Sequence, residues 1–165
     1  MALINEKNGK IEDILARDGV YASVTVGVSM RPLFKTHRDM VILESPVELP
    51  KKYDVALYRS GEKYILHRIV KVDERAGNFI IRGDNTYRNE IVPFGSIIAI
   101  LTAFNRKGKR ISTTNRGYRI YSVVWTWIYP LRYPFGKARL LAGAVYHKIF
   151  KRNNRKTESD RSGEK

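Results

Sequence analysis

The stretch VYASVTVGV, residues 20–28, is rich in β-branched residues and leads directly into Ser29. β-Branched residues favour extended backbone, so this stretch predicts a strand. Similar short stretches follow it, separated by the Gly, Pro and Asn residues typical of turns, at 40–43, 54–58, 64–72, 79–82 and 96–104. Short strands joined by tight turns predict a mostly β domain over residues 20–104.

The segment ahead of this domain predicts a short helix and no membrane anchor. Residues 11–16 (IEDILA) place apolar side chains at helical spacing, and Asp18-Gly19 is expected to end the helix, so residues 1–19 form a helical lead-in. Charges interrupt this segment, so no secretory signal is expected. The longest apolar stretch, residues 120–131, has 12 residues, whereas a transmembrane helix needs about 20. We therefore expect a protein that is cytoplasmic or peripheral on a membrane surface.

Positive charge is concentrated in the rear third of the chain. Residues 1–104 hold 15 Lys/Arg against 13 Asp/Glu, and residues 105–165 hold 16 against 3. Residues 105–150 predict a basic, aromatic-rich and partly helical extension, with the helix over 137–150. Residues 151–165 predict a disordered tail. Such a surface fits an acidic partner, either anionic lipid or nucleic acid.

The composition excludes several kinds of site. The chain has no cysteine, which rules out disulfides, thiolate metal ligands and a cysteine nucleophile. Its three histidines do not have a metal-binding spacing, so we expect neither a metal nor a cofactor.

Two motifs suggest a nucleophile and a base. GVSMRP, residues 27–32, places Ser29 at a strand end, where substrate can reach it and backbone amides can hold an oxyanion. YILHRIV, residues 64–70, places His67 between two isoleucines of one strand face, which suits a base whose pKa stays near or below neutrality. Taken alone, each motif is better explained by an ordinary turn serine or by a structural histidine.

A third motif supplies the acid that a serine–histidine pair needs. IIRGDN, residues 80–85, contains Asp84, and Glu90 follows six residues later. Gly-Asp-Asn after a strand is also a common turn. Both carboxylates are therefore candidates.

Together, in this order and spacing, the motifs resemble those of the type I signal peptidases. The match comprises Gly-x-Ser-Met-x-Pro, a strand holding Asp54-Val55, His-Arg-Ile-Val and Arg-Gly-Asp-Asn, and covers residues 20–104. It is nearer to the branch of the endoplasmic reticulum and archaea, which uses histidine as base, than to the main bacterial branch or the LexA-like repressors, which use lysine. The resemblance implies a signal-peptidase/LexA-like β fold and an endopeptidase that cleaves precursor proteins or peptides through an acyl-enzyme.

Carried onto this sequence, the resemblance makes Ser29 the nucleophile and His67 the base, with Met30 and Pro32 contacting the substrate. Asp84 matches the aspartate of the family's Gly-Asp-Asn box. The histidine branch has a second aspartate six residues later, where this chain has Glu90. We favour Glu90 as the acid that orients the imidazole, with Asp84 shaping the site.

Two departures from the family leave other functions open. Glu90 in place of the aspartate is compatible with a catalytically idle relative that binds peptides or lipid. Members of the family usually begin with a transmembrane anchor, whereas this chain begins with a short polar helix. The resemblance therefore supports the peptidase chemistry more than the cleavage of secreted precursor proteins. A third hypothesis is a LexA-like self-cleaving regulator, whose lysine base and leading DNA-binding domain do not match.

The rear third predicts a membrane-surface element. Its candidate contacts with anionic lipid, within residues 106–152, are Trp125, Trp127, Arg132 and Lys137. Alternatively, residues 118–150 pack on the β domain. Nucleic acid is the least expected partner, because the sequence contains no recognisable nucleic-acid-binding module.

Overall fold

The computed structural model describes residues 2–4 and 10–134, and its architecture is mostly β, as predicted. The strands, in chain order, are β1 (Ala2–Ile4), β2 (Val20–Gly27), β3 (Met40–Glu44), β4 (Val55–Ser60), β5 (Lys63–Asp73), β6 (Asn78–Arg82), β7 (Glu90–Pro93), β8 (Ile97–Arg106) and β9 (Lys109–Ser112). Helix α1 (Ile11–Asp18), the 3-10 turn η1 (Phe94–Ser96) and helix α2 (Arg116–Trp127) complete these elements.

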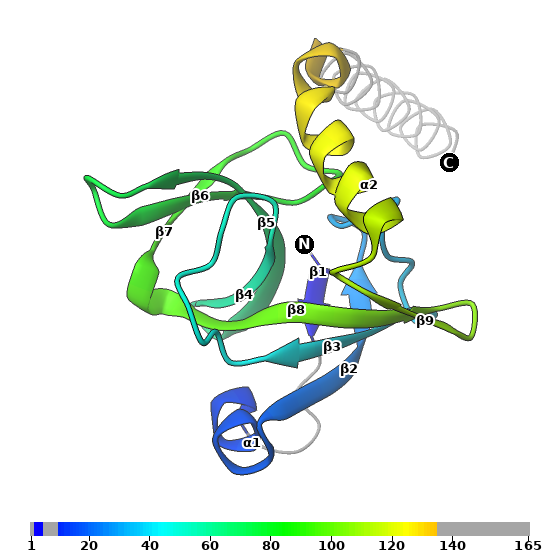
Figure 1. Cartoon of the computed structure of the whole chain (residues 1–165). Coiled ribbons are helices and arrows are strands. Elements are labelled where there is room, and N and C mark those ends of the chain that lie inside the picture. Colours follow the sequence, from blue (N-terminus) through cyan, green and yellow to red (C-terminus); the bar gives the residue numbers. More distant parts are fainter. Residues whose placement is uncertain (1, 5–9, 135–165) are drawn as a thin grey trace, which may run out of the picture. The chain divides into compact units, whose positions relative to one another are not determined.

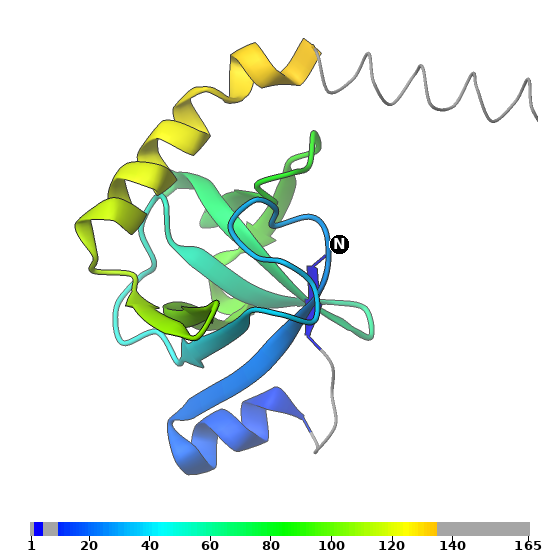
Figure 2. The ribbon, with the colours of Figure 1, turned by 90° about the vertical axis from the view of Figure 1, so that its right-hand side faces the viewer.

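The strands form one antiparallel sheet that closes on itself (Figure 1). Their order is β1-β2-β3-β8-β4-β5-β6-β7, and β9 pairs with β8. β1 pairs with both β2 and β5, so the strands β1, β2, β3, β8, β4 and β5 form a closed ring. A closed ring leaves fewer free strand edges than an open sheet. The β6–β7 hairpin extends the sheet beyond β5. Figures 1 and 2 show α1 and α2 at opposite ends of the sheet.

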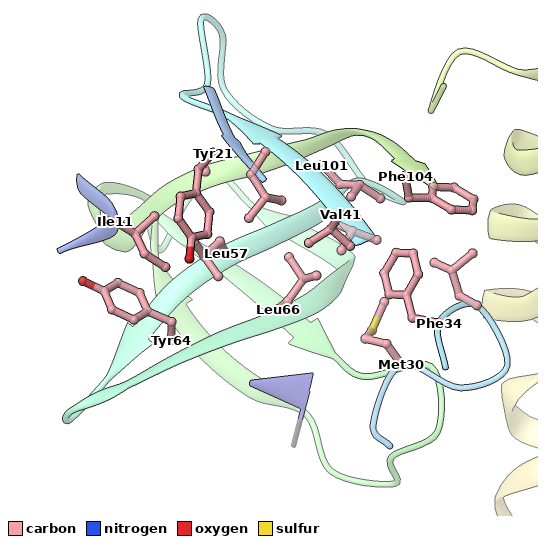
Figure 3. Close-up of a cluster of buried hydrophobic side chains, with 14 of the residues drawn as sticks. Ile11, Tyr21, Met30, Phe34, Val41, Leu57, Tyr64, Leu66, Leu101 and Phe104 are labelled. Atoms are coloured by element: carbon pink, nitrogen blue, oxygen red, sulfur yellow. The ribbon is translucent and has the colours of Figure 1, made fainter. Parts of the chain in front are cut away.

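β5 contributes to two hydrophobic clusters because its side chains alternate between the two faces of the sheet. Tyr64 and Leu66 enter the larger cluster, which β3, β8, α1 and the loop after β2 also line (Figure 3). Ile65 and Ile69 enter a second cluster, shared with β4, β6 and β7. His67 lies on this second face, between the two isoleucines, as the sequence predicts.

α1 ends where the sequence predicts. Gly19 adopts a left-handed φ of 74°, and its N–H donates to the carbonyl of Leu15 at 2.9 Å, which caps the helix. Ile11 and Leu15 are buried in the larger cluster. The Tyr64 hydroxyl of β5 donates to the Glu12 carboxylate, which joins α1 to the sheet.

Four elements differ from the sequence expectation. β1 and β7 are short strands that were not expected, and β1 lies within the expected helical lead-in but pairs with β2 and β5. The predicted basic loop over residues 106–110 is instead a hairpin, in which Lys107 and Gly108 take positive φ values of 51° and 78° between β8 and β9. The aromatic segment that follows contains helix α2, whose period was hidden because apolar residues occupy both of its faces.

The compact unit that contains the sheet extends to Trp127, beyond the expected boundary near residue 104. Tyr118 of α2 is buried in the larger cluster, so part of the expected extension packs on the β domain. Residues 128–134 belong to a second unit, in which the rings of Tyr129 and Tyr133 lie 5.7 Å apart. In the described ranges, no helix combines the length and the apolar character that a membrane span requires. The helix expected over 137–150 and the tail 151–165 lie outside the described residues.

Candidate active site

The sheet brings Ser29 and His67 into hydrogen-bond contact. β2 ends at Gly27, whose φ of 101° turns the chain, and Ser29 follows two residues later. β5 carries His67. The Ser29 Oγ lies 2.8 Å from the His67 Nε2, and the two residues are only 2% and 1% exposed. This contact has the geometry of a nucleophile and its general base.

Glu90 is the acid that faces His67. Its Oε1 lies 3.2 Å from the His67 Nδ1, and its Oε2 accepts a hydrogen bond of 2.7 Å from the Tyr58 hydroxyl. The Tyr58 hydroxyl is also 3.4 Å from Nδ1. β-Sheet register explains this cluster, because Ala56 lies opposite His67, Ile81 lies opposite Glu90, and side chains two residues apart share a face.

Burial determines the protonation states in this cluster. Desolvation lowers the pKa of the His67 imidazole below its ordinary value, and the neighbouring Glu90 carboxylate opposes this only in part. Burial, together with the hydrogen bond to Glu90, raises the pKa of Tyr58, so its phenol remains a donor. Because the Glu90 carboxylate can only accept, the proton of the neutral imidazole is assigned to Nδ1, which leaves Nε2 to accept the proton of Ser29.

Asp84 is held by a buried ion pair with Arg68. Its carboxylate accepts two hydrogen bonds from Arg68, of 2.8 and 2.9 Å, and one of 2.9 Å from the Tyr121 hydroxyl. Its backbone carbonyl accepts a hydrogen bond from the Trp125 indole at 2.9 Å. Arg68 also donates to the Ser122 hydroxyl at 2.8 Å. This network joins the Gly-Asp-Asn turn to β5 and to α2.

The same turn holds the Ser29 backbone in place. The Asn85 N–H donates to the Ser29 carbonyl at 2.6 Å, and the Asn85 side chain donates to the Val28 carbonyl at 3.3 Å. A Cβ added at Gly83 would lie 2.7 Å from the Ser29 carbonyl oxygen and 2.9 Å from the His67 Nε2. A side chain at position 83 would therefore displace the Ser29 backbone, the His67 ring or both.

The two residues expected to contact substrate differ from each other in exposure. Met30 is 1% exposed and packs in the larger cluster (Figure 3), because the turn after Ser29 directs its side chain into the core. Met30 therefore packs in the core, and its contact with substrate stays a prediction. Pro32 is exposed and follows a cis peptide bond with Arg31.

The four residues expected to contact a membrane also differ in exposure and in position. Trp125 is half-buried, stacks on Tyr121 with ring centroids 5.6 Å apart, and bonds to Asp84. Trp127 is 72% exposed. Arg132 lies in the second unit, and Lys137 lies outside the described residues.

Tyr58 and Arg68 are site residues that the sequence analysis missed. The role of Arg68 could have been predicted, because a charged residue within the apolar stretch YILHRIV indicates a buried ion pair. Tyr58 and Ala56 lie on the same face of β4. Only the register between β4 and β5 shows that His67 of β5 lies on this face of the sheet too.

Comparison with protein-family models, curated proteins and solved structures finds no match to the chain. The function is therefore inferred from the residues and geometry described above.

Proposed function

We propose that the chain is a serine endopeptidase of the signal-peptidase type that acts on precursor proteins or peptides. The observation that carries this proposal is the 2.8 Å contact between Ser29 Oγ and His67 Nε2, with Glu90 on the opposite side of the ring. A buried, neutral imidazole between a hydroxyl and a carboxylate has the arrangement that activates a serine. The resemblance of the three motifs to the histidine branch of the family supports the same chemistry.

The proposed reaction has two steps. Ser29 Oγ attacks the carbonyl carbon of the peptide bond and transfers its proton to His67 Nε2, which then protonates the leaving amine as the bond to nitrogen breaks. Water next attacks the acyl carbon of the acyl-enzyme and gives a proton to Nε2. The bond between this carbon and Ser29 Oγ then breaks, Oγ takes the proton back from Nε2, and the carboxyl product leaves. In both steps the Glu90 carboxylate stabilises the charged imidazolium and fixes the orientation of the ring.

Access to Ser29 involves β1. This strand pairs with Gly27, two residues before Ser29, and with Ile65, two residues before His67. An extended peptide that reaches the Ser29 hydroxyl competes for the same strand edges, because added strands bind through main-chain hydrogen bonds. We therefore expect β1 to move when substrate binds.

A fluorophosphonate tests the nucleophile without knowledge of the substrate. The probe should label Ser29, as identified by mass spectrometry of the digested protein. Ser29→Ala should abolish labelling, and His67→Ala should slow it by at least about a hundredfold, the lower end for loss of a general base. Ser60→Ala is the matched control, because Ser60 is exposed at the end of β4, opposite Lys63, and takes no part in the contacts between Ser29, His67 and Glu90.

Peptide cleavage is then measured on a mixture of peptides by mass spectrometry. The proposal requires products that appear with wild type and not with Ser29→Ala. Absence of both labelling and products would favour an idle, peptide-binding relative. Cleavage confined to the chain itself would favour a self-cleaving regulator.

A further inference from the structure

The outward face of α2 carries an apolar stripe. It consists of Ile120, Val123, Val124 and Trp127, which are 64%, 39%, 49% and 72% exposed. Their spacing of three, four and seven residues places them within an arc of about 100° on the helix surface. The stripe is therefore a continuous surface and not a set of scattered side chains.

The opposite face of α2 already packs on the domain. Tyr118 and Ser122 are buried, and Tyr121 and Trp125 make the contacts with Asp84 described above. A helix that packs on a domain through one face usually presents polar residues to water on the other. The apolar outer face of α2 departs from this pattern, and such exposed patches mark interaction sites.

The chain segment that carries the stripe is positively charged. Residues 105–127 contain six Lys/Arg and no Asp/Glu. Arg116 and Arg119 lie on α2 itself, each four residues before a member of the stripe, and both are exposed. Exposed Lys109 and Arg110 of β9 come shortly before the helix. An apolar stripe with flanking cations is the pattern of a helix that lies in a membrane interface.

We propose that this stripe of α2 docks on an anionic lipid surface. Lipid phosphates would neutralise Arg116 and Arg119 while the apolar side chains enter the acyl boundary. A second copy of the chain fits less well, because it would bring the same cations together. Trp127 contacts the lipid, whereas Trp125 keeps its bond to the Asp84 carbonyl. The proposal does not depend on peptidase activity.

The test uses the full chain and vesicles of phosphatidylcholine with or without phosphatidylglycerol. The double variant Ile120→Gln/Val124→Gln should lower the vesicle partition coefficient at least about tenfold, because burial of two aliphatic side chains is lost. The matched control is Val47→Gln/Leu49→Gln, which makes the same kind of change at exposed residues of the β3–β4 loop and should bind as wild type. Circular dichroism establishes that both variants are folded.

Tryptophan fluorescence gives an independent measurement, because the chain has only two tryptophans. With Trp125→Phe, the remaining Trp127 emission should shift to the blue on vesicle binding and be quenched by brominated lipid. With Trp127→Phe, Trp125 should show neither change. Wild-type partitioning by the stripe variant would overturn the proposal and assign binding to the basic residues alone. Self-association that the stripe variant abolishes, without vesicle binding, would assign the stripe to a second copy.

Discussion

Gly83→Ala should separate Ser29 from His67 with little change in overall fold. Gly83 does not have the left-handed φ that favours glycine, so the backbone accepts alanine, and the effect comes from the new Cβ. This atom would lie 2.7 Å from the Ser29 carbonyl oxygen and 2.9 Å from the His67 Nε2, whereas ordinary contacts begin at 3.4 Å. One or both groups must therefore move by roughly 0.5–0.7 Å, because neither is the end of a flexible side chain.

This displacement is large compared with the tolerance of the candidate pair. The Ser29 Oγ and His67 Nε2 are 2.8 Å apart, and a shift near 1 Å costs about a hundredfold in rate in well-positioned sites. Overpacking of this kind lowers the free energy of unfolding by only about 1–3 kcal/mol. We therefore expect a loss of activity much larger than the loss of stability.

The assay is the second-order rate constant for fluorophosphonate labelling of Ser29, measured beside thermal unfolding. Gly95→Ala is the control, because a Cβ at Gly95 meets no atom within 4 Å. Labelling of Gly83→Ala at the wild-type rate would refute the proposed geometry. Unfolding of the variant would instead show that the contact is mainly structural.

Three further substitutions separate the roles of the surrounding groups. Glu90→Gln should lower the labelling rate by about 10²–10⁴-fold and move its acidic limb to lower pH, because the carboxylate that raises the pKa of His67 is lost. Tyr58→Phe should lower the rate less, by about tenfold, because the acid keeps its charge and loses one hydrogen bond that orients it. Asp84→Asn should lower the free energy of unfolding in urea by about 3–5 kcal/mol, because Arg68 is left as an uncompensated buried charge.

The pH dependence of labelling and the free energy of unfolding test the roles of Glu90 and Asp84. In wild type, burial lowers the pKa of His67, so the rate should hold as pH falls to about 6.5 and decline below it. An acidic limb that stays in place in Glu90→Gln would show that the carboxylate does not face the imidazole. Asp18→Asn removes an exposed ion pair with Arg17 and should leave stability unchanged. Full stability of Asp84→Asn would contradict the buried role of its ion pair.

The local pattern of the sequence determined the strands β2 to β6 and β8 and the candidate pair. β-Branched stretches and glycine turns specify where strands begin and end, because these preferences act over a few residues. Alternation along YILHRIV was sufficient to place His67 between two isoleucines on one face. The order of the motifs pointed to Ser29, His67 and Glu90, and the structure places these three side chains together.

Only the tertiary structure decided which groups surround that pair. Tyr58 meets Glu90 because strand register joins β4, β5, β6 and β7, and register depends on pairings between distant segments. The sequence predicts that Asp84 shapes the site, but only the fold shows that Arg68, 16 residues earlier, binds its carboxylate. The two faces of α2 are both apolar, so its pattern alone could not tell which face packs on the sheet. That choice is made by the shape and charge of the surface it meets, which no local pattern encodes.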